Sequence, residues 1–251
     1  AAARELSVAQ RMREQPRSPA DFSAIISGDD PPLIVGGQAV NIWAELYVGA
    51  APELAEFEPF MSRDADILGT RALAVALAAR AGWECLSAQR DTVTVAVLTK
   101  ASDTGDLPLV VEVLDEVIGL TISDLALHET VEAHDGKHYR LLSPLVMLKA
   151  KLYNLISLVG HDRPQDLRHV LMLVTIGPHY LNEMATQVRE KKEPERELLG
   201  AIRYLGDLLR LPWVGNAVRT HRLDLRAMFP AWLREACPDA ARAALDEIAV
   251  P

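Results

Sequence analysis

Two aspartates that stand two residues apart, Asp64 and Asp66, constrain the fold of this chain more than any other feature. They begin a segment with the pattern of a strand, and side chains at positions i and i+2 of a strand point to the same face. Upstream, residues 33–35 have the pattern of a short buried strand, Gly36-Gly37 that of a turn, and residues 38–47 that of an amphipathic helix. This order predicts a mixed α/β arrangement in which two carboxylates converge on one spot.

Composition and charge exclude several classes of protein. Of 251 residues, 49% are hydrophobic and 24% are charged, which is ordinary for a folded globular protein. No apolar run approaches the roughly 20 residues that span a bilayer, so we expect no membrane partner. The two cysteines, Cys85 and Cys237, are far apart, which argues against a disulfide framework and for a reducing cytoplasm. The net charge of −9 argues against a large nucleic-acid surface but leaves a local basic cleft open.

Hydrophobic periodicity divides the chain into two halves. In the first half, strand patterns cover residues 64–68, 92–98 and 107–114, and a weaker hairpin pattern pairs residues 131–133 with 138–142 around Asp135-Gly136. Helical patterns there cover residues 38–48 and 70–82. From Ser143-Pro144 onward the pattern is helical throughout, at residues 143–158, 164–176, 179–187, 195–210 and 238–249.

These patterns predict an α+β fold, with a mixed β-sheet flanked by helices and then a C-terminal bundle of helices. We expect three domains: an N-terminal helical lead-in at residues 1–30, a sheet domain at residues 31–142 and a helical domain at residues 143–251.

The spacing of the two aspartates favours a metal site. Like charges held this close repel each other unless a cation lies between them, and Mg²⁺ binds carboxylate oxygens together with substrate phosphates. Glycines at the Gly36-Gly37 turn allow a phosphate to approach the backbone, where the following helix presents free N–H groups. The alternative for the aspartates is a solvated Asp-x-Asp in a turn, and a lone Gly-Gly pair more often only ends a strand.

Glu112 is the candidate for a third carboxylate, which a two-metal site requires. It interrupts the apolar strand pattern of residues 109–114, and a charge buried there without a partner is costly. Asp115, near the end of this strand, is easily solvated. The alternative is that Glu112 lies on the open face of an edge strand.

The combination of these segments resembles the nucleotidyltransferase superfamily that shares the DNA polymerase β-type catalytic core. The resemblance rests on Gly36-Gly37-x-Ala39, on Ser62-x-Asp64-x-Asp66 and on the acidic residue of the strand at 110–114. Residues 142–152, with Lys149 and Lys151, and residues 163–167, with Asp166, look like the helical region of the nucleotidyltransferase-like toxins of abortive-infection, type IV toxin–antitoxin systems. The resemblance covers about residues 33–173 and implies a nucleotidyltransferase-type sheet.

The resemblance implies a catalytic role for three carboxylates. Asp64 and Asp66 would bind Mg²⁺ or Mn²⁺, and Glu112 would be the third metal ligand and the general base. The family usually has Asp where this chain has Glu112, which lengthens the arm of the proposed base.

The resemblance also implies a set of nucleotide-binding residues, namely Gly36, Gly37, Ser62 and Lys151. The family often has Ser at the position of Gly37, so a hydroxyl near the phosphates is missing. Lys149 is the alternative to Lys151, because residues i and i+2 of a helix lie about 200° apart and only one of them can face a cleft. The other alternative for each lysine is a solvated helix face.

The expected function is therefore that of an enzyme, a metal-dependent nucleotidyltransferase that uses an NTP, releases pyrophosphate and transfers a nucleoside monophosphate to a hydroxyl. Resemblance to the toxins implies tRNA or protein as acceptor and a cognate antitoxin as partner. Two alternatives stay open: a transferase acting on an aminoglycoside-like small molecule, and a nucleotide-binding interaction protein whose Glu112 marks lost or weak catalysis.

Overall fold

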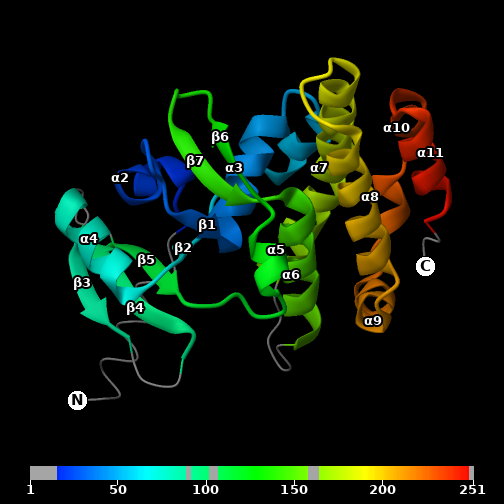
Figure 1. Cartoon of the computed structure of the whole chain (residues 1–251). Coiled ribbons are helices and arrows are strands. Elements are labelled where there is room, and N and C mark those ends of the chain that lie inside the picture. Colours follow the sequence, from blue (N-terminus) through cyan, green and yellow to red (C-terminus); the bar gives the residue numbers. More distant parts are fainter. Residues whose placement is uncertain (1–15, 89–91, 102–106, 158–163, 249–251) are drawn as a thin grey trace. The chain divides into compact units, whose positions relative to one another are not determined.

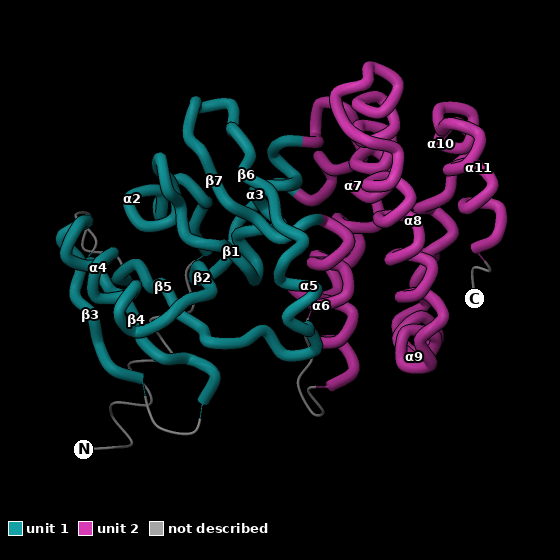
Figure 2. The backbone as a smooth tube through the Cα atoms, in the orientation of Figure 1, with its two compact units in different colours: residues 1–46, 58–143 teal, residues 47–57, 144–251 magenta. Residues whose placement is uncertain are grey.

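The computed structural model describes residues 16–88, 92–101, 107–157 and 164–248. Half of the predicted N-terminal lead-in, at residues 1–15, and the predicted helix end at Leu158 lie outside the described residues. The chain divides into two compact units (Figure 2): unit 1 comprises residues 1–46 and 58–143, and unit 2 comprises residues 47–57 and 144–251. The sequence patterns gave no sign that residues 47–57 group with the C-terminal helices.

Within the described residues, unit 1 contains a mixed sheet of seven strands in the order β3-β4-β5-β2-β1-β7-β6. The pairs β1–β7 and β2–β5 are parallel, and the other neighbours are antiparallel. The strands are β1 (Leu33–Val35), β2 (Ala65–Leu68), β3 (Glu84–Ser87), β4 (Thr94–Lys100), β5 (Leu109–Leu114), β6 (His128–Glu132) and β7 (His138–Leu142). This sheet, with the helical unit that follows it, confirms the predicted α+β fold class.

Short helical segments and two longer helices accompany the sheet: η1 (Pro19–Phe22), α2 (Ser23–Ile26), α3 (Gly36–Tyr47), α4 (Arg71–Ala81) and α5 (Ile122–Leu125). Helix α4 packs on β3 and β4 (Figure 1). The Thr70 side chain caps its N-terminus by accepting a hydrogen bond from the Leu73 amide, and Gly82 ends it in the left-handed conformation. Helix α3 begins two residues earlier than predicted, because Gly36 itself makes the turn out of β1.

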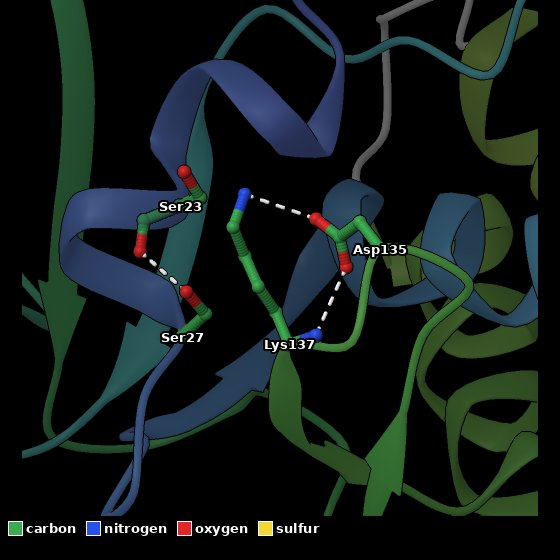
Figure 3. Close-up of polar contacts among 4 residues, drawn as sticks. All are labelled: Ser23, Ser27, Asp135 and Lys137. Carbon is green, nitrogen blue, oxygen red and sulfur yellow. Dashed lines mark hydrogen bonds and ion pairs between the residues drawn. The ribbon is translucent and has the colours of Figure 1, made fainter.

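The hairpin of β6 and β7 closes through the predicted Asp135-Gly136 turn. The Asp135 carboxylate accepts a hydrogen bond of 3.1 Å from the Lys137 amide and pairs with the Lys137 ammonium at 2.9 Å (Figure 3). Gly136 supplies the positive φ, of 73°, that this turn needs. The segment after α2, where the Ser27 hydroxyl donates to the Ser23 carbonyl, forms a bridge to Tyr139 of β7.

The two faces of the central strands differ in burial. Ala65 and Ile67 of β2, and Val111 and Val113 of β5, are fully buried. Asp66 and Glu112, which alternate with them, point to the opposite face and are half-buried. The acidic side chains therefore lie on the more open face of the sheet.

Unit 2 is built from helices: η2 (Pro52–Phe57), α6 (Pro144–Ser157), α7 (Pro164–Arg189), α8 (Glu195–Leu209), α9 (Pro212–His221), η3 (Leu225–Met228), α10 (Ala231–Ala236) and α11 (Asp239–Asp246). Hydrogen bonds attach the segment 47–57 to α7: the Tyr47 hydroxyl donates to Glu183 Oε2 at 2.6 Å, and the Arg168 guanidinium donates to the Phe57 carbonyl. No helix in the described part of the chain has the length and apolarity to cross a membrane.

Several predicted boundaries were wrong. The patterns at residues 164–176 and 179–187 belong to one helix, α7, which continues through Pro178. Strand β2 begins at Ala65 and leaves Asp64 in the preceding bend, while β4 runs two residues later than predicted. Strand β3 was not predicted. It has four residues and lies at the edge of the sheet, next to β4, so its side chains do not alternate between buried and exposed.

The burial difference across the sheet yields a matched pair of variants. Ile67→Ala removes a fully buried side chain from β2 and should lower the free energy of unfolding by about 2–5 kcal/mol. Ile122→Ala removes the same atoms from a residue that is 88% exposed and should change it by about 0.5 kcal/mol or less. Urea denaturation followed by circular dichroism measures both, and equal losses would contradict the assignment of the core.

Candidate functional site

The turn from β1 into α3 lies directly against Asp66. Val35, the last residue of β1, pairs in register with Asp66 of β2, and Gly36 follows with a φ of 70°. A β-carbon built on Gly36 would overlap Oδ2 of Asp66 and lie 2.8 Å from its Cγ. Only glycine therefore fits at this position, both for its backbone conformation and for the space that the carboxylate occupies.

The structure brings two of the three predicted carboxylates side by side. Asp66 of β2 and Glu112 of β5 are partners in the parallel register, so their side chains lie on the same face of neighbouring strands. Asp64 is half-buried in the bend that leads into β2, two residues before Asp66. The alternative of an Asp-x-Asp in a solvated turn does not hold for Asp66, which lies within an inner strand.

Glu112 lies in the interior of the sheet, since β5 is flanked by β4 and β2. This position excludes the alternative that Glu112 belongs to an edge strand. Its Oε2 accepts a hydrogen bond of 3.1 Å from the Thr94 hydroxyl, next to the irregularity in the β4–β5 register at Thr94 and Ala96. Thr94 thus orients the carboxylate that the sequence analysis singled out.

The described residues contain no group of three His, Cys, Asp or Glu side chains that could enclose a metal ion. Asp64, Asp66 and Glu112 therefore do not form a closed metal cage, and Glu112 as a metal ligand stays a prediction. The donor chemistry of Asp64 and Asp66 nevertheless fits Mg²⁺ or Mn²⁺, because protein-bound Mg²⁺ is commonly held by one or two carboxylates plus phosphate oxygens and water.

The predicted nucleotide-binding residues of unit 1 lie at different depths. Gly36 is half-buried at the turn, whereas Gly37 is buried in the first turn of α3. Ser62 is only 2% exposed, and its hydroxyl accepts a hydrogen bond of 3.0 Å from the Asn41 amide. The structure thus gives Ser62 a partner inside the protein, and its role toward a nucleotide stays a prediction.

The two lysines of α6 have different surroundings within unit 2. Lys151 is 7% exposed, and its ammonium pairs with Oδ1 of Asp166 on α7 at 2.9 Å. Lys149 is half-buried, and its ammonium lies 5.9 Å from the centroid of the Tyr204 ring. Neither lysine is on a solvated helix face, and the proposed role of Lys151 toward phosphate stays a prediction.

His169 adds a third titratable group to the buried pair of Lys151 and Asp166, one helical turn beyond Asp166 on α7. It is 1% exposed, and neither of its ring nitrogens has a hydrogen-bond partner within the described part of the chain. Burial, followed by the charge of Lys151, holds the pKa of His169 well below its ordinary value, while Asp166 acts in the opposite direction. The imidazole is therefore neutral at physiological pH.

Sequence reasoning missed Thr94, Gln38 and Asn41. Thr94 belongs to a strand that was predicted, but nothing in its spacing shows that its hydroxyl reaches Glu112. Gln38 and Asn41 do carry a signal: both are polar, three residues apart, and lie within an otherwise buried run of α3. Polar residues at buried helix positions are bonded to specific partners, which here follow from the tertiary structure.

The overlap at Gly36 predicts a difference between two glycine substitutions. Gly82→Ala has the same φ of 70° but open space around the new β-carbon, so it should lower the free energy of unfolding by about 1–2 kcal/mol through backbone strain. Gly36→Ala adds the displacement of Asp66 and should cost about 1–3 kcal/mol more. Urea denaturation compares the two, and an equal loss would show that Asp66 does not occupy the space at Gly36.

His169 predicts a pH dependence of stability. Because the pKa of His169 is lowered in the folded protein, the unfolded chain binds more protons below about pH 6.5. The contribution of the neutral His169 to stability is fully present above this pH. As the pH falls below it, the free energy of unfolding decreases by up to about 1.4 kcal/mol per pH unit because of this residue. His169→Leu should flatten this dependence between pH 7 and pH 5 in urea denaturation, whereas Val170→Ala should lower stability equally at each pH. Parallel curves for the parent and His169→Leu would contradict the prediction.

Comparisons with known proteins assign no family to the chain. A scan against protein-family models finds no match, and a search of curated proteins finds none either. Among solved structures, the chain is similar to an antigenic nucleotidyltransferase-like protein from Paracoccidioides brasiliensis, at 16% identity and a TM-score of 0.43, over 86% of this chain and 99% of that protein. A similarity of this size establishes neither a family nor an activity, so the function has to follow from the residues themselves.

Proposed function

We propose that this chain is a metal-dependent nucleotidyltransferase, which transfers a nucleoside monophosphate from an NTP to a hydroxyl acceptor. One observation carries the proposal: the Asp66 carboxylate lies directly against the Gly36 turn at the start of α3, and Glu112 stands beside Asp66 in register. A turn that suits phosphate and a pair of carboxylates that suits a metal ion thus occupy the same place on the open face of the sheet.

The turn supplies the phosphate contacts. Helix α3 is 12 residues long, and its first turn begins with Gly36, which is half-buried, and Gly37, which is buried. Free N–H groups and the positive end of the helix dipole favour an anion there. The triphosphate of the NTP is the anion that this proposal places at the turn.

The carboxylates supply the chemistry. Asp64 and Asp66 would hold Mg²⁺ or Mn²⁺, which when bound offsets negative charge on the phosphates. The acceptor hydroxyl oxygen forms a bond to the α-phosphorus, the bond from that phosphorus to pyrophosphate breaks, and Glu112 takes the hydroxyl proton. The Thr94 hydroxyl, bonded to Oε2 of Glu112, orients the carboxylate for this proton transfer.

A nucleotide-binding protein with weak or lost catalysis is the second candidate. It is favoured by the lack, among the described residues, of a three-carboxylate group that could enclose a metal ion. In this case the Gly36 turn and the two aspartates would still bind a metal–nucleotide complex, but Glu112 would serve only as the partner of Thr94.

The acceptor is a separate part of the proposal. The sequence resemblance to toxins of type IV toxin–antitoxin systems favours the 3′ end of a tRNA or a protein side chain, with a cognate antitoxin as partner. An aminoglycoside-like small molecule is the alternative acceptor. Incubation with NTPs labelled at the α-phosphate, Mg²⁺ and, in separate reactions, total RNA, cell protein or an aminoglycoside distinguishes these acceptors by where the label appears.

Substitution of the carboxylates tests the proposal. Asp66→Asn and Glu112→Gln should each reduce transfer of the α-phosphate label by about 10²–10³-fold, because the first removes a metal ligand and the second the base. The matched control is Asp115→Asn, an exposed acid just beyond the end of β5, which should transfer label at the parent rate.

Two outcomes separate the candidates. Metal-dependent NTP binding by the parent without transfer to any acceptor, in Mn²⁺ as well as Mg²⁺, supports the binding protein. Equal metal–nucleotide affinity in the parent and Asp66→Asn places the site elsewhere and removes both candidates.

A further inference from the structure

We infer that Asn41 is a positioning residue, whose side-chain amide fixes the Asp64–Asp66 segment relative to the Gly36 turn. The inference rests on the proposed function, since it concerns the geometry of the same metal–nucleotide site. It assigns a role to a polar cluster that comprises the half-buried Arg17 and the buried Gln38, Asn41 and Ser62, of which the sequence analysis used only Ser62.

Asn41 joins two segments of chain through both hydrogens of its amide. Its Nδ2 donates to the Ser62 hydroxyl at 3.0 Å and to Oε1 of Gln38 at 3.1 Å. Gln38 lies one turn earlier on α3, and its own Nε2 donates to the Arg17 carbonyl at 3.0 Å and to the Ser62 carbonyl at 3.4 Å. The first two turns of α3 are thus bonded to the chain just before β2.

Ser62 is held by its backbone as well. Its amide donates to the Arg17 carbonyl at 3.0 Å, and its carbonyl accepts from the Arg17 amide at 2.8 Å. The Arg17 guanidinium in turn donates to the Leu107 carbonyl at 2.9 Å, two residues before β5 begins. The amide, the carbonyl and the hydroxyl oxygen of Ser62 therefore each have a partner within this cluster.

Three of the four residues of the cluster lie in the sequence between the Gly36 turn and the aspartates. Gln38 and Asn41 follow Gly36 by two and five residues, and Ser62 precedes Asp64 and Asp66 by two and four residues. A shift of Ser62 away from α3 would carry the aspartates with it, because only Arg63 separates Ser62 from the bend at Asp64 that leads into β2. The close fit of Asp66 against Gly36 leaves little room for such a shift.

A contribution to stability alone does not explain why an amide side chain occupies the buried position of Asn41. Gln38 and Asn41 are both 0% exposed, and Oδ1 of Asn41 has no hydrogen-bond partner among the residues that the structure describes. A buried acceptor without a partner costs free energy that an apolar side chain of the same size would avoid. The amide hydrogens that bind Ser62 and Gln38 are what an apolar side chain could not supply.

The test uses binding of Mn²⁺ in the presence of an NTP analogue with a non-hydrolysable α,β bond, measured by electron paramagnetic resonance. Asn41→Leu keeps the size of the side chain and removes its amide, and Ser62→Ala removes only the acceptor hydroxyl. Each should weaken Mn²⁺–nucleotide binding by about tenfold, the lower end of the range for residues that orient metal ligands. The double variant should bind no more weakly than Asn41→Leu, since both changes break the same bond.

The control is Val40→Ala, an adjacent residue of α3 that is 0% exposed and apolar. It should destabilise the protein in urea while leaving Mn²⁺–nucleotide affinity unchanged. Amide hydrogen exchange adds a readout without ligand: residues 63–68 should exchange faster in Asn41→Leu and Ser62→Ala than in Val40→Ala at equal global stability.

The outcomes separate the inference from the proposed function. If the parent binds Mn²⁺–nucleotide more tightly than Asp66→Asn, but Asn41→Leu and Ser62→Ala bind as the parent does, the positioning role is wrong and the proposed function stands. If the parent fails to bind, or Asp66→Asn binds equally well, the proposed function fails and the positioning role fails with it. If Asn41→Leu does not fold, the Mn²⁺–nucleotide affinity of Ser62→Ala alone tests the positioning role.

Discussion

The contact between the Asp66 carboxylate and the Gly36 turn is the constraint on which the sheet unit depends. It requires the antiparallel register that places Val35 opposite Asp66, a residue without a side chain after Val35, and a left-handed backbone at that residue. It also brings one carboxylate to the start of α3 and beside Glu112, its partner in the parallel register. The positive end of the helix offsets part of the charge that accumulates there, and a bound cation would offset more.

The fold could be predicted where neighbouring residues determine it. Thr70 and Gly82 bound α4 because capping depends on the residues next to a helix end, and Asp135-Gly136 closes a hairpin because its turn needs a positive φ. Strand β3 and the continuity of α7 depend on packing instead. Pro178 predicts a break in isolation, but the helix around it is held by buried side chains on both sides of the proline.

In the candidate site, too, some features follow from neighbouring residues and others depend on packing. The strand pattern predicted Asp64 and Asp66 on one face, but β2 begins at Ala65 and leaves Asp64 in the bend before it. Glu112, predicted as the third carboxylate, lies beside Asp66 in the parallel register of β2 and β5. The bond between Thr94 and Glu112, and those that Asn41 makes with Ser62 and Gln38, join segments whose pairing no local pattern specifies. Sequence reasoning could therefore find the acidic residues of the site, whereas the residues that orient them required the tertiary structure.

The ion pair of Lys151 complicates any test of its predicted contact with phosphate. Its ammonium is paired with Asp166 inside unit 2, beside a histidine that stays neutral. Removal of one partner of a buried ion pair typically costs about 3–5 kcal/mol, because the other charge is left buried without compensation. A loss of activity in a variant of Lys151 alone would therefore report on the folding of the helical unit as much as on any contact with phosphate. Replacement of Lys151 and Asp166 together by apolar residues of similar size removes both charges, so that an effect on nucleotide binding can be separated from an effect on stability.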